Sequence, residues 1–182
     1  MALIPMSALI RWRTRRFIGP VITELLGIYG LDLPPQVQLG EDVLFWHRGL
    51  GTVITPWTSI GDRVHIFQGV TIGGSDPTLR HRPGFFEGVR IEDDAILCAG
   101  AKVLAGSTLL TVGRGTIVGA NSVLLESTGE YEIWGGIPAR CLGSREHGQR
   151  NTPIRMGDAP VRERSLTRIA RSARHVRALR RE

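Results

Sequence analysis

The chain has 182 residues, a formal net charge of +6, 23 glycines and only 6% aromatic residues. This length fits one domain with a hydrophobic core, and the composition favours many short strands joined by tight turns over a helical bundle. Its two cysteines, Cys98 and Cys141, have no spacing that predicts a disulfide framework or a zinc site.

Residues 1–31 are predicted to be an N-terminal helical segment. Apolar residues from Ile18 to Tyr29 have a helical spacing, and Gly30 is a suitable stop. The basic run from Arg11 to Arg16 lacks the uninterrupted apolar stretch of a signal peptide, and no stretch of the sequence approaches a membrane span. We therefore expect a cytoplasmic protein with reduced cysteines.

Residues 32–143 contain an apolar repeat with a step of six. The aliphatic residues that keep this step are Ile54, Ile60, Ile66, Ile72, Ile91, Leu97, Val103, Val112, Val118 and Leu124. Such a step fits neither a helix nor a hairpin ladder, but it fits a coil with three flat sides and aliphatic residues pointing inward. Residues 74–90 break the step with glycine, proline and charge, which predicts a projecting loop.

Residues 144–182 are predicted to be a basic tail, a linker followed by an amphipathic helix over 165–181. The stretch 145–182 carries 11 arginines against four acidic residues. Contact of this tail with a polyanion, either nucleic acid or an anionic membrane surface, defines one function class, a non-catalytic binding module.

Five segments resemble the successive signatures of hexapeptide-repeat acyltransferases. They are Ile60-Gly61-Asp62-Arg63-Val64, Gln68-Gly69-Val70-Thr71-Ile72-Gly73-Gly74, Ala99-Gly100-Ala101-Lys102-Val103-Leu104, Val118-Gly119-Ala120-Asn121-Ser122-Val123 and Gly136-Ile137-Pro138-Ala139-Arg140. The second segment is most similar to the serine acetyltransferase branch. The resemblance implies a mainly β fold, a left-handed parallel β-helix. It also implies a homotrimeric, acetyl-CoA-dependent O-acetyltransferase of cysteine biosynthesis that uses no metal.

His47 and Asp32 are the predicted catalytic residues. Asp32 precedes His47 by fifteen residues, which is the spacing between the catalytic histidine and its carboxylate partner in serine acetyltransferases. The resemblance implies that His47 removes the acceptor's proton, while Asp32 fixes the imidazole tautomer and stabilises the imidazolium. Direct attack on the thioester is expected, because neither cysteine has a neighbouring histidine in the sequence for covalent catalysis.

Three residues are predicted to bind the acceptor. Arg80 and His81, in the projecting loop, match the pair that contacts the amino-acid substrate in that family, and a guanidinium offers forked donors to a carboxylate. Trp46 stands where the family often has an aspartate that holds the serine ammonium. Since an aromatic face suits a sugar ring, O-acetylation of a sugar or polysaccharide unit is the alternative to serine.

Acetyl-CoA is expected as the co-substrate, bound between subunits. The backbone amides of Gly73 and Gly74 are the predicted oxyanion donors. The resemblance implies further coenzyme contacts at the backbone of Ala99, Gly100, Gly119 and Ala120. It also implies that the two cations Lys102 and Arg140 lie near the phosphates. A gamma-type carbonic anhydrase shares the coil but needs three histidine ligands, a constellation that this sequence lacks.

Two departures from the family pattern bear on assembly. Serine acetyltransferases carry a long N-terminal helical domain that joins two trimers, whereas only 31 residues precede Asp32 here, which predicts a single trimer. The family's C-terminal peptide that docks into cysteine synthase ends in isoleucine. This chain ends in Arg180-Arg181-Glu182, so the cysteine synthase complex is not expected.

Overall fold

The computed structural model describes residues 6–76 and 87–145. Residues 1–152 form one compact unit and residues 153–182 a second, which lies outside the described residues. The predicted tail helix over 165–181 therefore lies outside them too, as do Arg80 and His81 of the projecting loop.

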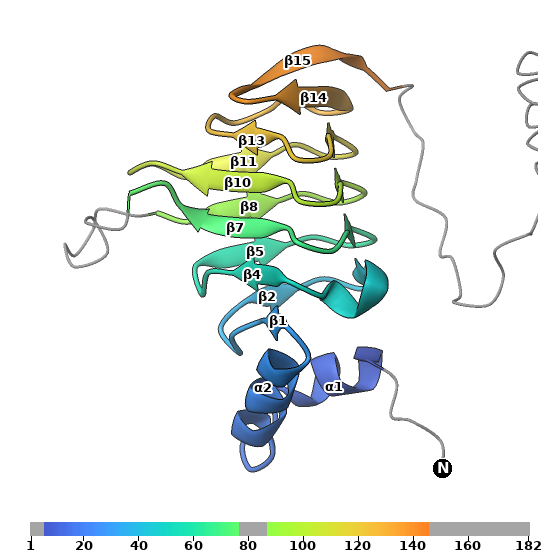
Figure 1. Ribbon diagram of the computed structural model, residues 1–182, viewed down its shortest axis with the longest axis vertical. Coiled ribbons are helices and arrows are strands. Elements are labelled where there is room, and N and C mark those ends of the chain that lie inside the picture. Colours follow the sequence, from blue (N-terminus) through green and yellow to red (C-terminus); the bar gives the residue numbers. More distant parts are fainter. Residues whose placement is uncertain (1–5, 77–86, 146–182) are drawn as a thin grey trace, which may run out of the picture. The chain divides into compact units, whose positions relative to one another are not determined.

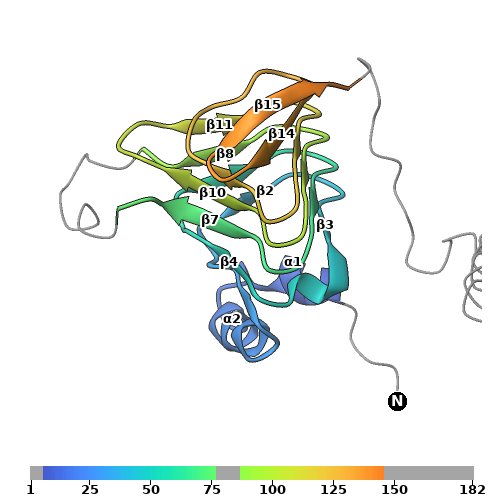
Figure 2. The same ribbon diagram turned by 45° about the horizontal axis from the view of Figure 1, so that its top comes forward.

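Three sheets of short strands surround a common interior (Figures 1 and 2). Sheet A consists of β1 (Leu31–Asp32), β4 (Thr52–Ile54), β7 (Thr71–Gly74), β10 (Lys102–Ala105) and β13 (Val123–Leu124). Sheet B consists of β2 (Gln38–Leu39), β5 (Thr58–Ile60), β8 (Val89–Ile91) and β11 (Leu110–Val112). Sheet C consists of β3 (Leu44–Phe45), β6 (His65–Ile66), β9 (Ile96–Leu97), β12 (Ile117–Val118), β14 (Glu132–Gly136) and β15 (Ala139–Ser144). The chain visits A, B and C in turn, so the described residues form a three-sided parallel β-helix.

The six-residue repeat supplies the interior of this coil. All ten of its aliphatic residues are buried. Strand register stacks them in three columns, namely Ile54, Ile72, Val103 and Leu124 in sheet A, Ile60, Ile91 and Val112 in sheet B, and Ile66, Leu97 and Val118 in sheet C. The predicted inward direction of these side chains is confirmed, because each step of six carries the chain from one sheet to the next.

The last turn of the coil differs from the others. Strands β14 and β15 pair antiparallel, whereas the other strand pairs of the described residues are parallel. The connection contains Gly136 at a φ of 100° and Pro138, which has no N–H for a ladder. The repeat stops at Leu124, so the chain turns back as a hairpin that closes this end (Figure 1).

Two helices lie at the opposite end, next to β1 (Figure 1). Helix α2 (Gly19–Ile28) occupies the stretch in which a helix was predicted, and α1 (Met6–Trp12) is a second helix within the predicted helical segment, where the apolar spacing had indicated only one. The guanidinium of the buried Arg13 donates to the carbonyls of Ile10 at 2.8 Å and Val37 at 2.6 Å, and burial lowers its pKa. These bonds fasten the helices to the first turn of the coil. The described helices are all too short or too polar to cross a membrane.

Candidate active site

The corner that carries His47 is longer than the equivalent corners above it. Seven residues lie between Phe45 and Val53, whereas four lie between their register partners, Ile66 and Thr71. The three additional residues are accommodated by η1 (Trp46–Gly49), a short 3₁₀ turn. The first passage from sheet C to sheet A, hereafter the C–A corner, therefore bulges where the sequence analysis found the coil interrupted.

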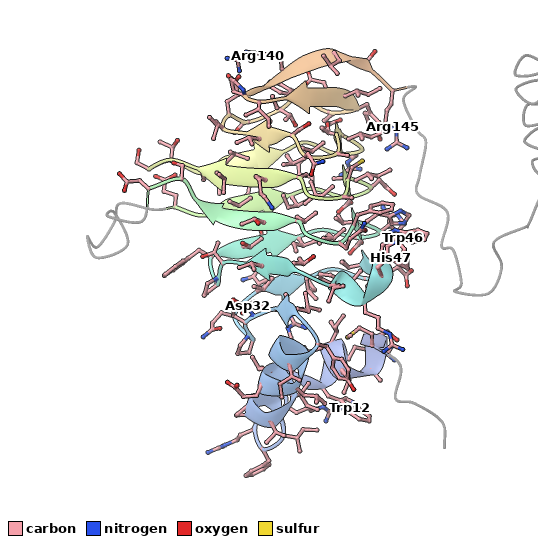
Figure 3. All side chains as sticks on the ribbon, viewed as in Figure 1. Trp12, Asp32, Trp46, His47, Arg140 and Arg145 are labelled. Atoms are coloured by element: carbon pink, nitrogen blue, oxygen red, sulfur yellow. The ribbon has the colours of Figure 1, made fainter. Side chains whose placement is uncertain are left out.

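The backbone of this bulge is strained. His47 has φ and ψ of 52° and 35°, and Arg48 has 62° and 16°. Left-handed conformations cost non-glycine residues about 1–3 kcal/mol each, and they persist where surrounding structure holds them. Here the amide of Gly51 donates to the carbonyl of Gly30 at 2.7 Å, which ties the bulge to the residue before β1. The result is an exposed imidazole on a fixed backbone (Figure 3).

Asp32 lies on β1, which is the neighbour in sheet A of β4, the strand that follows the corner with His47. It is in register with Val53, and its side chain is exposed on the outer face of sheet A (Figure 3). Within residues 6–76 and 87–145, no hydrogen bond joins Asp32 to His47. The orienting role of Asp32 stays a prediction.

The C–A corners of the higher turns lie above His47. Ala99 and Gly100 form one of them, and Gly119 and Ala120 form the next. The amide of Asn121 donates to the carbonyl of Ala99 at 2.9 Å, which fixes one corner over the other. The structure thus brings His47 and four of the predicted coenzyme residues onto one edge of the coil, with small side chains at the upper corners.

The two cations predicted to bind phosphate have protein partners. The ammonium of Lys102 donates to the carbonyl of Gly69 at 2.8 Å, beside the same edge. The guanidinium of Arg140 pairs with Glu126 at 3.0 Å and has a side chain 65% exposed. Both side chains retain donors for a ligand, although the positive charge of Arg140 is already paired with Glu126.

Gly73 and Gly74 lie at the other end of sheet A. From Thr71, β7 runs about 10 Å away from the C–A corner, at the usual rise of a strand. Its pairing with β4 stops at Ile72, so the two glycines extend past β4 with no strand beside them on that side. They lead into the loop that carries Arg80 and His81. The predicted site is therefore divided between opposite edges of one chain.

Trp46 has a packing role that the sequence analysis missed. Its indole stacks on Phe67, with centroids 5.1 Å apart and an interplanar angle of 8°, and meets His65 edge-on at 5.9 Å. Its Nε1 is buried without a hydrogen-bond partner among the described residues. One face of the indole is therefore occupied within the chain. Strand register could have predicted this contact, because Trp46 and Phe67 each follow the last residue of a strand and those two strands, β3 and β6, are paired.

Burial also shifts the pKa of two reactive side chains on or next to sheet C, Cys98 and His65. It raises the pKa of the Cys98 thiol, which disfavours the nucleophilic thiolate. It lowers the pKa of His65, although Asp94 opposes this change. Among the residues that the structure describes, no group of three His, Cys, Asp or Glu side chains could hold a metal ion.

Known proteins give a consistent comparison. No protein-family model matches the chain. A serine acetyltransferase of Bacillus licheniformis is 39% identical over 133 residues, which cover 71% of this chain and 56% of that protein. The crystal structure of serine acetyltransferase from Vibrio cholerae superposes with a TM-score of 0.66 at 25% identity, covering 81% of this chain and 55% of that one. A serine acetyltransferase complex with CoA gives a TM-score of 0.62 at 27% identity, covering 75% and 55%.

The three-sided coil and its six-residue repeat place the chain in the class of hexapeptide-repeat β-helices. Within that class, the chain is similar to the serine acetyltransferases in sequence and in fold. It spans about half the length of the curated relatives that it matches.

Proposed function

We propose that this chain transfers the acetyl group of acetyl-CoA to the hydroxyl of L-serine or a closely related hydroxy amino acid. The observation that carries the proposal is the single edge on which His47, on its strained bulge, lies below two corners of small residues. A base below corners with small side chains suits attack on a thioester whose pantetheine arm would lie along those corners.

The chemistry needs one base and one set of oxyanion donors. His47 removes the hydroxyl proton as the hydroxyl oxygen attacks the thioester carbonyl, and backbone amides at Gly73 and Gly74 stabilise the oxyanion. When the tetrahedral intermediate collapses, the C–S bond breaks and the CoA thiolate takes the proton back from the imidazolium. No covalent enzyme intermediate is required, which agrees with the raised pKa of Cys98.

We further infer that the complete site forms between two copies of a left-handed coil in a homotrimer. The support is the separation of His47 from Gly73 and Gly74, which lie at opposite ends of sheet A. The surface that we assign to subunit contact is sheet C, where strand register aligns outward, half-buried residues. These are Leu44, Ile96, Ile117 and Ile133, with His65 between the first two.

A mixing experiment tests the divided site. His47→Ala and Arg80→Ala chains, each inactive alone with amino-acid acceptors, are unfolded, mixed one to one and refolded. If sites combine residues from two subunits, about a quarter of the sites in a random mixture contain both intact residues, and activity returns. Equal mixtures that remain inactive, although sizing shows mixed trimers, would place the whole site in one chain.

The acceptor is tested by release of the CoA thiol from acetyl-CoA across a panel of hydroxy amino acids and sugars. We expect turnover with L-serine, and a larger loss in Arg80→Ala for amino acids than for sugars, since sugars have no carboxylate for the guanidinium. Sugar acetylation without serine acetylation would support the second candidate, a sugar or polysaccharide O-acetyltransferase. That candidate is favoured by Trp46, because a tryptophan at position 46 supplies no carboxylate to bind the ammonium group of serine.

A further inference from the structure

The helices at the first-turn end carry an uncovered apolar surface. Its residues, hereafter the N-terminal patch, are Trp12, Phe17, Ile18, Val21, Ile28 and Tyr29, all of which are exposed. The exposure reaches 88% for Phe17 and 81% for Ile28. Figure 3 shows Trp12, the last residue of α1, at the helical end of the coil.

Helix α2 is apolar on two opposite sides. Ile22 and Leu26 are buried against the coil, whereas Val21 and Ile28, seven residues apart, share the outer side. Glu24 is the single charged residue of the helix. A contiguous exposed apolar patch normally marks an interaction site, so the outer side of α2 points to an occupant.

The charges around the patch indicate the chemistry of that occupant. Arg11, Arg15 and Arg16 are exposed, and none of them has an ion-pair partner among the described residues. The guanidinium of Arg16 lies 6.0 Å from the ring centroid of Phe17, beside the most exposed side chain of the patch. Glu24 is the only acidic residue from position 6 to position 30. The surface thus combines apolar side chains with an uncompensated positive charge.

We propose that the N-terminal patch binds an anionic membrane surface. Phe17, Val21 and Ile28 would enter the boundary between headgroups and acyl chains, while the arginines would meet acidic headgroups. A two-fold contact between the patches of two chains fits less well, because such an isologous contact would bring two copies of the arginine cluster together. Nucleic acid would accept the arginines but would leave Val21 and Ile28 in water.

The attachment of the helices suits this task. Arg13, buried between the arginines that face outward, bonds α1 to the first turn of the coil through the Val37 carbonyl. The patch is therefore held on a rigid support, which reduces the ordering that binding requires. Membrane contact at this end leaves the C–A edge with His47 on the side of the coil, so the proposal does not depend on the identity of the acceptor.

Hydrogen exchange on the full chain tests the proposal without any substitution. The chain is compared alone, with phosphatidylcholine vesicles, and with vesicles of phosphatidylcholine and phosphatidylglycerol. We expect slower exchange in α2 and residues 13–18 only with the anionic vesicles. Protection confined to residues 146–182, which are also basic, would overturn the proposal. Protection of α2 that rises with protein concentration in the absence of lipid would overturn it in favour of a second copy.

Vesicle sedimentation of variants gives a second readout. Each arginine at an anionic surface strengthens binding by about fivefold, so Arg15→Gln/Arg16→Gln should weaken it by roughly 25-fold. A control on the coil, with Arg90→Gln on β8 and Arg114→Gln in the turn after β11, removes the same charge and should change binding much less. Val21→Gln/Ile28→Gln should also weaken binding, unlike Leu125→Gln/Leu142→Gln, which alters exposed apolar residues elsewhere. Equal losses in patch variants and their controls would show that only net charge or tail contact matters.

Discussion

The indole of Trp46 lies nearly parallel to the phenyl ring of Phe67, with ring centroids 5.1 Å apart. Trp46 belongs to the first turn of the coil and Phe67 to the second, and both follow the ends of paired strands. The residue before His47 is thus fixed by packing against the next turn. Since Trp46 begins the strained bulge, we infer that this stacking helps to hold the backbone of His47.

Replacing Trp46 with aspartate should have two opposing effects. The carboxylate would supply a partner for a serine ammonium and lower the KM for L-serine. Trp46→Asp removes the stacking on Phe67 and places a charge beside the rings of His65 and Phe67. Together these changes should cost about 2–4 kcal/mol of stability. Thermal unfolding and acceptor titration measure the two effects. The control Trp46→Phe keeps an aromatic ring without a carboxylate, and a similar fall in KM there would argue against an ammonium contact.

His47→Ala should lower turnover by at least about a hundredfold at saturating acceptor, because a general base contributes factors of this size. The side chain is exposed, so the melting temperature and the oligomeric state should change little. Asp32→Asn should lower turnover less, since it leaves the base in place. Near-normal turnover of purified His47→Ala would show that another group removes the proton.

Gly100→Ala should impair acetyl-CoA use more than acceptor use. Gly100 has a φ of 72°, and an added Cβ would collide with the side-chain oxygen of Asn121 at the predicted coenzyme corner. We expect a loss of about 1–2 kcal/mol in stability and a raised KM for acetyl-CoA. Gly106→Ala is the matched control, because nothing lies within 4 Å of its added Cβ. Unchanged KM values for acetyl-CoA in a folded Gly100→Ala variant would remove this corner from the coenzyme site.

His65 should make the stability of the chain sensitive to mild acid. Burial lowers its pKa, so below the ordinary value of 6.5 the unfolded chain binds the proton more readily than the folded chain. This contribution to stability is complete above that value and is lost as the pH falls towards the lower folded pKa. Melting temperatures from about pH 7.5 to about pH 5 should therefore fall more steeply for the natural chain than for His65→Gln. Parallel curves would contradict this.

Removal of residues 146–182 should leave the coil folded and acetyl transfer largely unchanged. Arg145 is best retained, because its guanidinium donates to the Gly115 carbonyl at 2.8 Å and its amide to that of Tyr131 at 2.6 Å. The deletion removes ten arginines and four acidic residues, so the salt needed to elute the chain from an immobilised polyanion should fall. Aggregation, or loss of the oligomer on sizing, would show that the tail covers apolar surface.

The sequence by itself determined the coil. Ile54 and Ile72 stand eighteen residues apart, and a six-residue step has to place them on the same side of a three-sided prism. Local pattern was sufficient because each turn of such a coil repeats the same short-range geometry. The sequence also showed that His47 lies where the six-residue repeat is interrupted, because the additional residues of this corner break the step of six.

Tertiary structure alone decided which residues meet across turns. Phe67 is twenty-one positions from Trp46, and no periodicity of apolar residues marks the pair, because both side chains lie outside the inward-facing columns. The same holds for Gly73 and His47, whose placement at opposite ends of sheet A depends on the length and direction of β7. A one-dimensional repeat specifies what faces the interior, whereas the outer surface is assembled from neighbouring turns in space. The division of the candidate site between two edges therefore became evident only once the turns were stacked.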